Sequence, residues 1–381
     1  MSVDSSDRER PLALFVRMAS RPIPRVSRMM AAARELGYDT VFVGATRDES
    51  LPRSDTWEGV RVERVGRPFP LVNGRRPFTY VRGVCSFWWG AAHFLVAMKP
   101  ALVHASDVEA GIPAILVARL RGVPVVYNIH DNLAARYVLP RWIAFLLNSL
   151  EGLLVASASV TLVPEPFRRD LLPRWARARV RVVRNSPEDP GSHAPSTGPA
   201  RPPRVLFAGW LDVGRGLREM LHLANQGVIH LVVAGDGDSQ LQAELRGARN
   251  VEYLGFCSHA DVIGLTIKCD YVAAFYDPAR TINRYAASNK IAEALAVGRP
   301  VLTNVELEVA SGLIAAGVAI AVPYACIREL GPDLDAWHTE PDRYTTAGRR
   351  AREHYERYYH STQVRRASLD AFREAGVIAW S

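Results

Sequence analysis

The chain of 381 residues is too long for one ordinary core, and a prior of roughly 150 residues per domain suggests two or three domains. Its hydrophobic content of 48% and charged content of 23% are typical of a folded globular protein and exclude a disordered one. The net charge of +8 favours an anionic partner: a phosphorylated small molecule, an anionic membrane or nucleic acid. Nucleic acid is the least supported, because the arginines are scattered and no nucleic-acid-binding motif is present.

The cysteines and the apolar segments indicate the compartment. The four cysteines show neither a CxxC pair nor Cys/His ligand spacing, which predicts reduced thiols without a disulfide framework or a structural metal. The polar start, Met1 to Arg10, lacks the apolar core of a signal peptide. The most apolar stretch, 142–160, is interrupted by Asn148 and Glu151, so it falls short of the ~20 apolar residues that a span needs. We expect a cytoplasmic protein that does not cross a membrane.

In the first half of the chain, short apolar runs alternate with amphipathic or apolar segments. The pattern predicts strands at 12–18, 39–45, 60–65, 101–107, 124–132, 159–164 and 179–185, and helices at 25–37, 82–100, 111–122 and 140–158. Between residues 185 and 204 the composition changes to "NSPEDPGSHAPSTGPARPPR". Pro, Gly and Ser dominate there and no periodicity remains, which indicates a domain linker.

After this linker the alternation starts again. Strands are expected at 204–210, 229–238, 250–256, 270–278 and 299–304, with helices at 215–227, 239–247, 259–269 and 288–298 and a basic helical tail from 344 to 376. The predicted fold class is α/β, with two doubly wound, Rossmann-like parallel sheets that face each other across a cleft. The expected boundaries are a first domain at 1–187, a linker at 188–203, a second domain at 204–360, and a C-terminal helix at 361–381 that packs back on the first domain.

The helix expected at 288–298, "SNKIAEALAVG", contains one of only three lysines among 47 cationic residues. Ser288 is a natural N-cap, and Gly298 supplies the C-terminal stop. The free N–H groups of the first turn attract an anion, and Lys290 adds a compact point charge at the same end. The alternative is a capped surface helix in which the pair Lys290–Glu293 contributes roughly 0.2–0.5 kcal/mol.

Several segments taken together resemble a known family. In the second half these are "VLFAGWLDVGRGLREML", "LVVAGDGDSQLQAEL", "YVAAFYDP" and "ASNKIAEALAVGRPVLTN", which are similar to the nucleotide-sugar-binding domain of GT-B glycosyltransferases, in particular the retaining family 4. In the first half, "PRVSRMMAAARELGYDTVFVG" and "HASDVEAGIPAILVARLRGVPVVYNIHDN" resemble the acceptor domain of that family.

The resemblance implies roles for particular residues. Glu293 matches the glutamate that binds the ribose diol of the donor, and Arg215 matches a cation that contacts the diphosphate. The implied donor-binding residues are Gly209, Arg215, Gly216, Asp277, Ser288, Asn289, Lys290 and Glu293. The implied catalytic residues are His130, beside the donor sugar, with Asp131 and Lys290. The sequence departs from the family at Tyr285, where a first motif glutamate is usual, and at Trp210, often a phosphate-binding Arg. The candidate replacements for the glutamate are Asp277 and a backbone group; the alternative is that the sugar 3- and 4-hydroxyls are recognised differently.

Two glycine-rich stretches resemble other nucleotide-binding motifs. "AGDGDSQ" lacks the GxGxxG spacing of a dinucleotide fingerprint, and "GWLDVGRG" lacks the Lys and the Ser/Thr of a P-loop. We therefore expect neither a bound NAD cofactor nor a Walker-type site. No DxD feature stands in a convincing place, so we expect no obligatory metal.

The expected activity is transfer of a sugar from a nucleoside diphosphate donor, with UDP as one candidate nucleotide, to a glycan, lipid-linked saccharide or natural-product acceptor, with retention of configuration. One alternative is a nucleotide-sugar epimerase or hydrolase that uses Asp131, Asp277 and Glu293 as acid and base. Another is a non-catalytic nucleotide-sugar-binding subunit. The apolar stretches "SFWWGAAHFLVAM" and "RWIAFLLNSLEGLL" are expected as core helices; the alternative is that one face dips into the inner surface of the membrane, near a lipid-linked acceptor.

Overall fold

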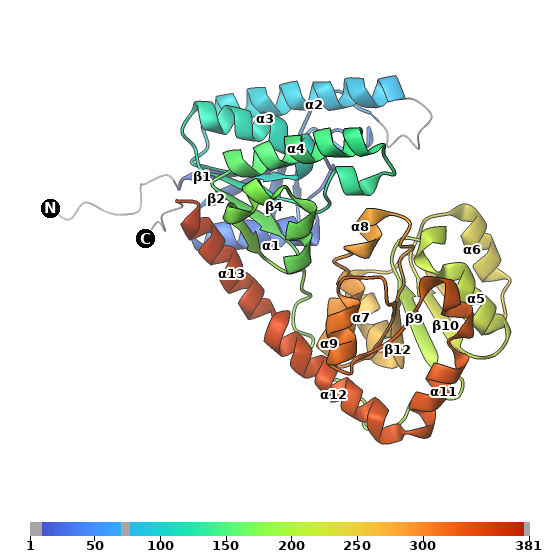
Figure 1. Ribbon diagram of the computed structural model, residues 1–381. Coiled ribbons are helices and arrows are strands. Elements are labelled where there is room, and N and C mark those ends of the chain that lie inside the picture. The colour runs from blue at the N-terminus through green and yellow to red at the C-terminus, as the bar shows by residue number, and fades with distance from the viewer. Residues whose placement is uncertain (1–9, 70–76, 377–381) are drawn as a thin grey trace. The chain divides into compact units, whose positions relative to one another are not determined.

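The computed structural model describes residues 10–69 and 77–376, and the chain divides into two compact units (Figure 1). The first unit comprises Met1–Arg184 and Arg365–Ser381, and the second comprises Asn185–Val364. Each unit has its own sheet, parallel or mostly parallel, and its own hydrophobic core.

The first unit contains an eight-stranded sheet in the order β3-β4-β2-β1-β5-β6-β7-β8. The strands are β1 (Leu12–Arg17), β2 (Asp39–Ala45), β3 (Ser54–Trp57), β4 (Val60–Val65), β5 (Leu102–Ser106), β6 (Val125–Asn128), β7 (Val160–Val163) and β8 (Val180–Val182). Its helices include α1 (Pro24–Glu35), α2 (Pro77–Met98), α3 (Asp107–Leu120) and α4 (Arg141–Ser157). The central strands are buried along their whole length, as expected for parallel strands covered by helices on both faces.

One strand of this sheet was not predicted. β3 pairs antiparallel with β4 at the edge of the sheet, whereas the other described pairings of the sheet are parallel. Its sequence, "SDTW", is four residues long, polar and exposed at alternate positions. Such a segment gives no apolar signal, because an edge strand with one solvated face needs little burial.

The second unit contains a six-stranded parallel sheet in the order β11-β10-β9-β12-β13-β14. The strands are β9 (Arg204–Ala208), β10 (His230–Ala234), β11 (Val251–Gly255), β12 (Tyr271–Ala274), β13 (Val301–Asn304) and β14 (Ala319–Val322). The helices are α5 (Leu217–Asn225), α6 (Ser239–Arg246), α7 (His259–Lys268), α8 (Thr281–Arg284), α9 (Asn289–Val297), α10 (Ala310–Ala315), α11 (Gly331–Thr339) and α12 (Pro341–Tyr358). The strand order reverses between β9 and β12, and this switch point is where open α/β sheets place ligands.

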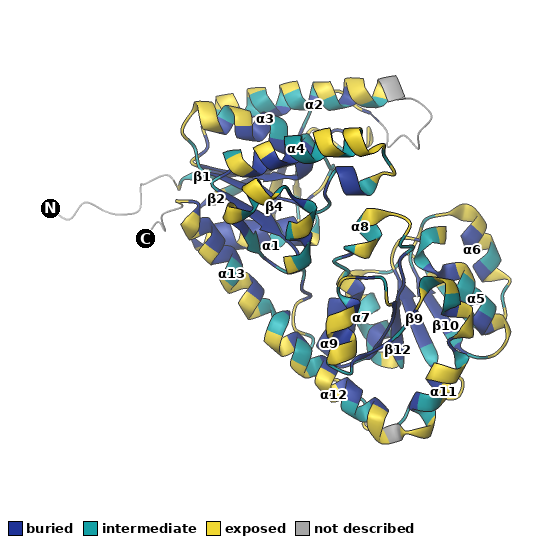
Figure 2. Ribbon diagram, viewed as in Figure 1, coloured by how far each residue is buried: buried dark blue, intermediate teal, exposed yellow. Residues whose placement is uncertain are grey.

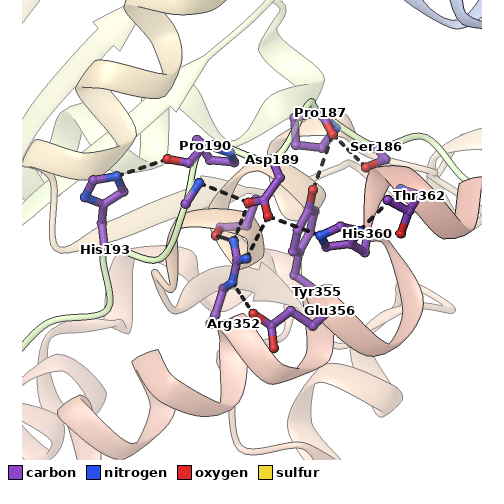
Figure 3. Close-up of polar contacts among 12 residues, drawn as sticks. Ser186, Pro187, Asp189, Pro190, His193, Arg352, Tyr355, Glu356, His360 and Thr362 are labelled. Atoms are coloured by element: carbon purple, nitrogen blue, oxygen red, sulfur yellow. Dashed lines mark hydrogen bonds and ion pairs between the residues drawn. The ribbon is translucent and has the colours of Figure 1, made fainter.

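The segment expected as a linker, 188–203, has no helix or strand and is counted with the second unit. Figure 3 shows how it is attached: the Asp189 carboxylate accepts hydrogen bonds at 2.6 and 2.9 Å from the Arg352 guanidinium on α12. His360 lies 3.1 Å from the same carboxylate. These partners hold the pKa of Asp189 below its ordinary value, with the hydrogen bonds from Arg352 as the largest cause. The Pro- and Gly-rich composition therefore does not make this segment free of the body of the unit.

The predicted helical tail consists of two helices, α12 and α13 (Ser361–Glu374). The chain passes from the second unit back to the first within α13. From Arg365 onward α13 belongs to the first unit. Arg365 forms an ion pair with Glu35 at 2.6 Å, and Glu374 pairs with Arg181 at 2.5 Å.

Candidate functional site

The first group of candidate residues lies at the switch point of the second unit. The loops that follow β9 and β10 run together: the Gly209 N–H donates to the Ala234 carbonyl at 2.8 Å, and the Leu211 N–H donates to the Asp236 carbonyl at 2.9 Å. A Cβ on Gly235, where φ is +154°, would stand 1.8 Å from the Gly209 carbonyl oxygen. Only glycine permits this approach, so the "AGDG" turn shapes the wall beside Gly209.

Lys290 occupies the first turn of α9, and the end of its side chain lies next to Gly209. Its side chain is buried, and Nζ lies 3.8 Å from the centre of the Phe207 ring in β9. A Cβ on Gly209 would lie 3.2 Å from Lys290 Cε, so the absence of a side chain at Gly209 leaves the space that the lysine fills. Within the described part of the chain, Lys290 Nζ has no hydrogen-bond partner. A buried ammonium in this condition is costly unless an anion or another acceptor meets it.

A second cation converges on the same place. Arg215 lies in the 3-10 helix η5 (Val213–Arg215), and its guanidinium stands 4.7 Å from the centre of the Tyr276 ring. Lys290 Nζ is 5.9 Å from that ring, so one aromatic side chain faces both cations. The Tyr324 hydroxyl fixes the turn after Arg215 by accepting the Gly216 N–H at 3.1 Å.

The electrostatics of this group favour an anion. Burial lowers the pKa of Lys290 well below 10.5, and the nearby positive charge of Arg215 lowers it further, while Glu293 opposes both effects. An incoming diphosphate would pair with Lys290 and Arg215 and raise the pKa of the lysine back toward its ordinary value. The N-terminus of α9 adds free backbone N–H groups and the positive end of the helix dipole.

Ser288 does not cap α9 as predicted. It stands at the N-cap position, yet its side chain makes no capping hydrogen bond. Instead the Tyr276 hydroxyl donates to Ser288 Oγ at 2.7 Å. The prediction was wrong because Tyr276, twelve residues earlier, is brought alongside by the sheet. The start of α9 consequently lacks a side-chain acceptor from its own N-cap.

Glu293 lies one turn into α9 and is buried, with its carboxylate 3.5 Å from His259 Nδ1 at the start of α7. Asn289, beside Lys290, is exposed. Asp277 turns back on its own loop, where its carboxylate accepts the Ala279 N–H at 2.9 Å. Tyr285 is the half-buried residue that ends α8.

The second group of candidates lies in the first unit, after β6. The His130 N–H donates to the Asp107 carboxylate at 2.8 Å, and the Asp131 N–H approaches the same oxygen at 3.4 Å. Asp107, at the start of α3, has a φ of +64°, a conformation that costs a non-glycine residue of order 1–3 kcal/mol and is concentrated at functional sites. The Asp131 carboxylate itself is 3.2 Å from the Arg168 guanidinium.

The ring of His130 is held in one tautomer. Arg25 can only donate, and its Nε points to Asn128 Oδ1 at 3.0 Å, which leaves Asn128 Nδ2 to face His130 Nε2 at 3.0 Å. Nε2 must therefore accept, and the proton of the neutral ring sits on Nδ1. Burial, followed by the charges of Arg17 and Arg25, lowers the pKa of His130 well below 6.5. The geometry suits a neutral donor of one hydrogen bond rather than an acid.

Sequence reasoning missed the residues that position these groups. No sequence motif marks Phe207, Tyr276 or Tyr324 as more than an ordinary aromatic residue of a strand or loop. Asp107 also belongs to no recognisable motif. One signal was available: Glu151 is the single acid within the apolar helix α4, and its buried carboxylate accepts hydrogen bonds from Asn132 Nδ2 and, at 3.3 Å, from the Leu133 N–H. A lone acid on a helix of this kind indicates a polar partner inside the fold.

The chain matches two family models in succession. Residues 22–188 match "Glycosyl transferase 4-like domain", and residues 202–325 match "Glycosyl transferases group 1". Glycogen synthase of Mycobacterium tuberculosis (strain ATCC 25618 / H37Rv) is 24% identical over 330 residues, which cover 74% of this chain and 73% of the relative. An N-acetylglucosamine transferase of Geobacillus kaustophilus, acting on a pyrophosphoryl-undecaprenol substrate by its name, is 30% identical over 115 residues, 28% of this chain and 31% of the relative.

Solved structures share the fold. Sucrose-phosphate synthase from Thermosynechococcus elongatus has a TM-score of 0.74 at 16% identity and covers 96% of this chain and 99% of its own. Anabaena HepE in complex with UDP and glucose has a TM-score of 0.66 at 15% identity, covering 96% of this chain and 100% of its own. Two parallel-sheet units and these matches define a glycosyltransferase of the GT-B type. The chain belongs to the family 4-like glycosyltransferases.

Proposed function

We propose that the protein transfers a sugar from a nucleoside diphosphate sugar to a hydroxyl acceptor with retention of the anomeric configuration. The observation that carries this proposal is Lys290 Nζ, buried over Phe207 without a hydrogen-bond partner among the described residues, at the switch point of the second unit. Arg215 and the uncapped start of α9 supply the other groups that a diphosphate requires.

The proposed role of this group is to stabilise the leaving diphosphate. As the bond between C1 and the phosphate oxygen breaks, its electron pair stays on that oxygen, and negative charge grows beside Lys290 and Arg215. Preorganised donors of this kind are often the largest single contribution to catalysis. In this proposal the acceptor hydroxyl attacks C1 from the same face, and its proton passes to the departing phosphate oxygen, so that the product would keep the anomeric configuration without a protein nucleophile.

Glu293 and His130 have supporting roles in the proposal. Glu293 would accept hydrogen bonds from the two ribose hydroxyls of the donor, with His259 holding its carboxylate at 3.5 Å. His130, neutral and with its proton on Nδ1, would donate to a hydroxyl of the donor sugar. Each of the three carboxylates that an epimerase or hydrolase would use has a neighbour: Asp131 pairs with Arg168, Asp277 bonds its own loop, and Glu293 lies 3.5 Å from His259.

UDP is the first nucleotide to test, because HepE was solved with UDP and glucose. The decisive experiment incubates the enzyme with α-linked UDP-sugars and a panel of soluble acceptors and follows the anomeric proton of the product by NMR. An α-linked product supports the proposal. A β-linked product would reject retention, and release of free sugar at the same rate without acceptor would favour a hydrolase. In the described part of the chain no group of three or more His, Cys, Asp or Glu side chains could hold a metal ion; independence from metals stays a prediction, tested by activity in excess chelator.

A further inference from the structure

The first unit exposes an unusual number of large apolar side chains. Of the eighteen such side chains that are exposed among the described residues, eleven lie between Val81 and Leu153. They are Val81, Trp89, Val96, Leu116, Leu120, Tyr137, Val138, Trp142, Phe145, Leu146 and Leu153. Single exposed apolar residues are normal on a protein surface, whereas a contiguous group of this size marks an interaction site.

Nine of these side chains lie on the helices α2, α3 and α4, and Tyr137 and Val138 lie in the loop that precedes α4. α2 packs on α3 and α3 packs on α4, so the three helices lie side by side (Figure 1). Exposed positions recur along all three in Figure 2. On α4, Trp142, Phe145 and Leu146 are 66%, 69% and 55% exposed and share one face at helical spacing. The opposite face of α4 is buried against the unit through Leu154 and Val155, so this helix is apolar on both sides.

The charges on the same layer have one sign. Between residues 79 and 157 the exposed charged residues are Arg82, Lys99, Arg119, Arg121 and Arg141, and none of them is acidic. The acids of this segment are buried or paired: Asp107 and Glu151 are buried, Glu109 pairs with Arg136, and the partly exposed Asp131 pairs with Arg168. We call the eleven apolar and five cationic residues together the α2–α4 face.

We propose that the α2–α4 face docks on an anionic lipid surface. Aromatic and aliphatic side chains on one face, framed by Arg and Lys, are the features of helices that lie in a membrane interface. Among the described residues no helix is both long and apolar enough to span a bilayer, so these helices would lie on the surface. A second copy of the chain is a poorer occupant, because pairing two such faces would bring like charges together without exposed acids to neutralise them.

The position of the α2–α4 face also indicates which class of acceptor the enzyme uses. This inference about the acceptor rests on the proposed transferase function. The loop that carries His130 is bound to α4 through Glu151, and it continues into the exposed Tyr137 and Val138. A face docked on lipid would hold this loop at the boundary between water and membrane. The acceptor would then be a hydroxyl of a lipid-linked saccharide or a lipid headgroup.

The test is flotation of the purified full chain with vesicles of phosphatidylcholine alone or mixed with phosphatidylglycerol. We expect binding only to the anionic vesicles, and weaker binding as salt rises. The pair Trp142→Ser/Phe145→Ser should bind at least tenfold more weakly. Phe256→Ser, at an aromatic of the second unit that is even more exposed (84%), should bind like the wild type.

A charge series separates the electrostatic contribution. Arg119→Glu/Arg121→Glu should also lose at least tenfold in partition, since each cation near an anionic surface contributes roughly fivefold. Arg249→Glu/Arg357→Glu, two exposed arginines of the second unit, changes the net charge equally and should have little effect. Failure of the wild type to float with anionic vesicles, or equal loss in both pairs, would overturn the proposal. So would a dimer that Trp142→Ser/Phe145→Ser dissociates while no vesicle binding is seen.

Activity assays distinguish a failure of the membrane-docking proposal from a failure of the proposed sugar-transfer function. Trp142→Ser/Phe145→Ser should keep wild-type nucleotide binding in the absence of vesicles. Lys290→Met should lose transfer and still float with anionic vesicles. Wild-type flotation with preferred transfer to soluble acceptors would keep the docking surface and reject the lipid-linked acceptor.

Discussion

Replacement of Lys290 by Met should make the free enzyme more stable and far less active. The variant keeps the length and most of the volume of the side chain but removes a buried ammonium that no described residue satisfies. Leaving such a group unpaired costs about 1–3 kcal/mol, while its position 3.8 Å from the Phe207 ring returns roughly 0.5–2 kcal/mol of cation–π attraction. The net gain in the free energy of unfolding should be about 1 kcal/mol, or a rise in Tm of about 2–4 °C for a unit of this size.

The gain should depend on pH in a defined direction. Because the pKa of Lys290 in the folded protein is lowered, the wild type binds fewer protons than its unfolded chain between that lowered pKa and 10.5. The stability of the wild type therefore rises with pH through this window, and the advantage of Lys290→Met shrinks. Below the lowered pKa the advantage is complete.

Turnover should move the other way. Loss of one preorganised donor to a developing charge typically lowers kcat by about 10²–10³. Lys290→Arg should also be impaired, because the wider guanidinium has no room between Phe207 and Gly209. Lys268→Met, on the exposed end of α7, is the matched control and should leave both quantities nearly unchanged. Calorimetric unfolding and initial-rate assays of the three variants measure these effects. A less stable Lys290→Met variant with near wild-type turnover would refute the reasoning.

Three further predictions concern other residues. Glu293→Ala should raise the donor KM roughly tenfold to a hundredfold and erase the preference for ribose over 2′-deoxyribose donors, and a variant that keeps this preference would remove Glu293 from the ribose site. His130→Ala should lower turnover roughly tenfold, and the pH–rate profile of the wild type should show no ionisation near pH 6.5. An unchanged rate would show that His130 has no role at the donor sugar. Asp189→Asn should lower the free energy of unfolding by about 1–2 kcal/mol at neutral pH, because the lowered pKa of Asp189 gives stability above about 3.9 that is lost as pH falls through the folded value. Denaturant unfolding across acidic pH measures this loss, and an equal deficit at all pH values would contradict the ion pair.

The predictable parts of this molecule are those whose structure follows from a local pattern of apolar and polar residues. Most of the buried strands and the helix of Lys290 were predicted from their apolar runs, and the glycine at residue 298 does close α9, with a φ of +78°. The buried strand β14, with the sequence "AIAV", was not predicted. The phosphate hypothesis for Lys290 needed only the order of residues around a helix start. The structure adds its burial and its missing partner, which no local pattern encodes.

What escaped prediction depends on residues distant in sequence. Ser288 looked like an N-cap, but the sheet places the Tyr276 hydroxyl against it. The tautomer of His130 is set by Arg25, more than one hundred residues earlier, through Asn128. The edge strand β3 is polar because solvent covers one side of it, so its pairing with β4 left no apolar signal.

A crystal structure of the enzyme with a nucleoside diphosphate bound measures the central claim most directly. Lys290 Nζ should lie about 2.8 Å from a phosphate oxygen, as charge-assisted hydrogen bonds do, with Arg215 turned from Tyr276 toward the same group. A diphosphate bound elsewhere, with Nζ still seated over Phe207 and unpartnered, would contradict the account.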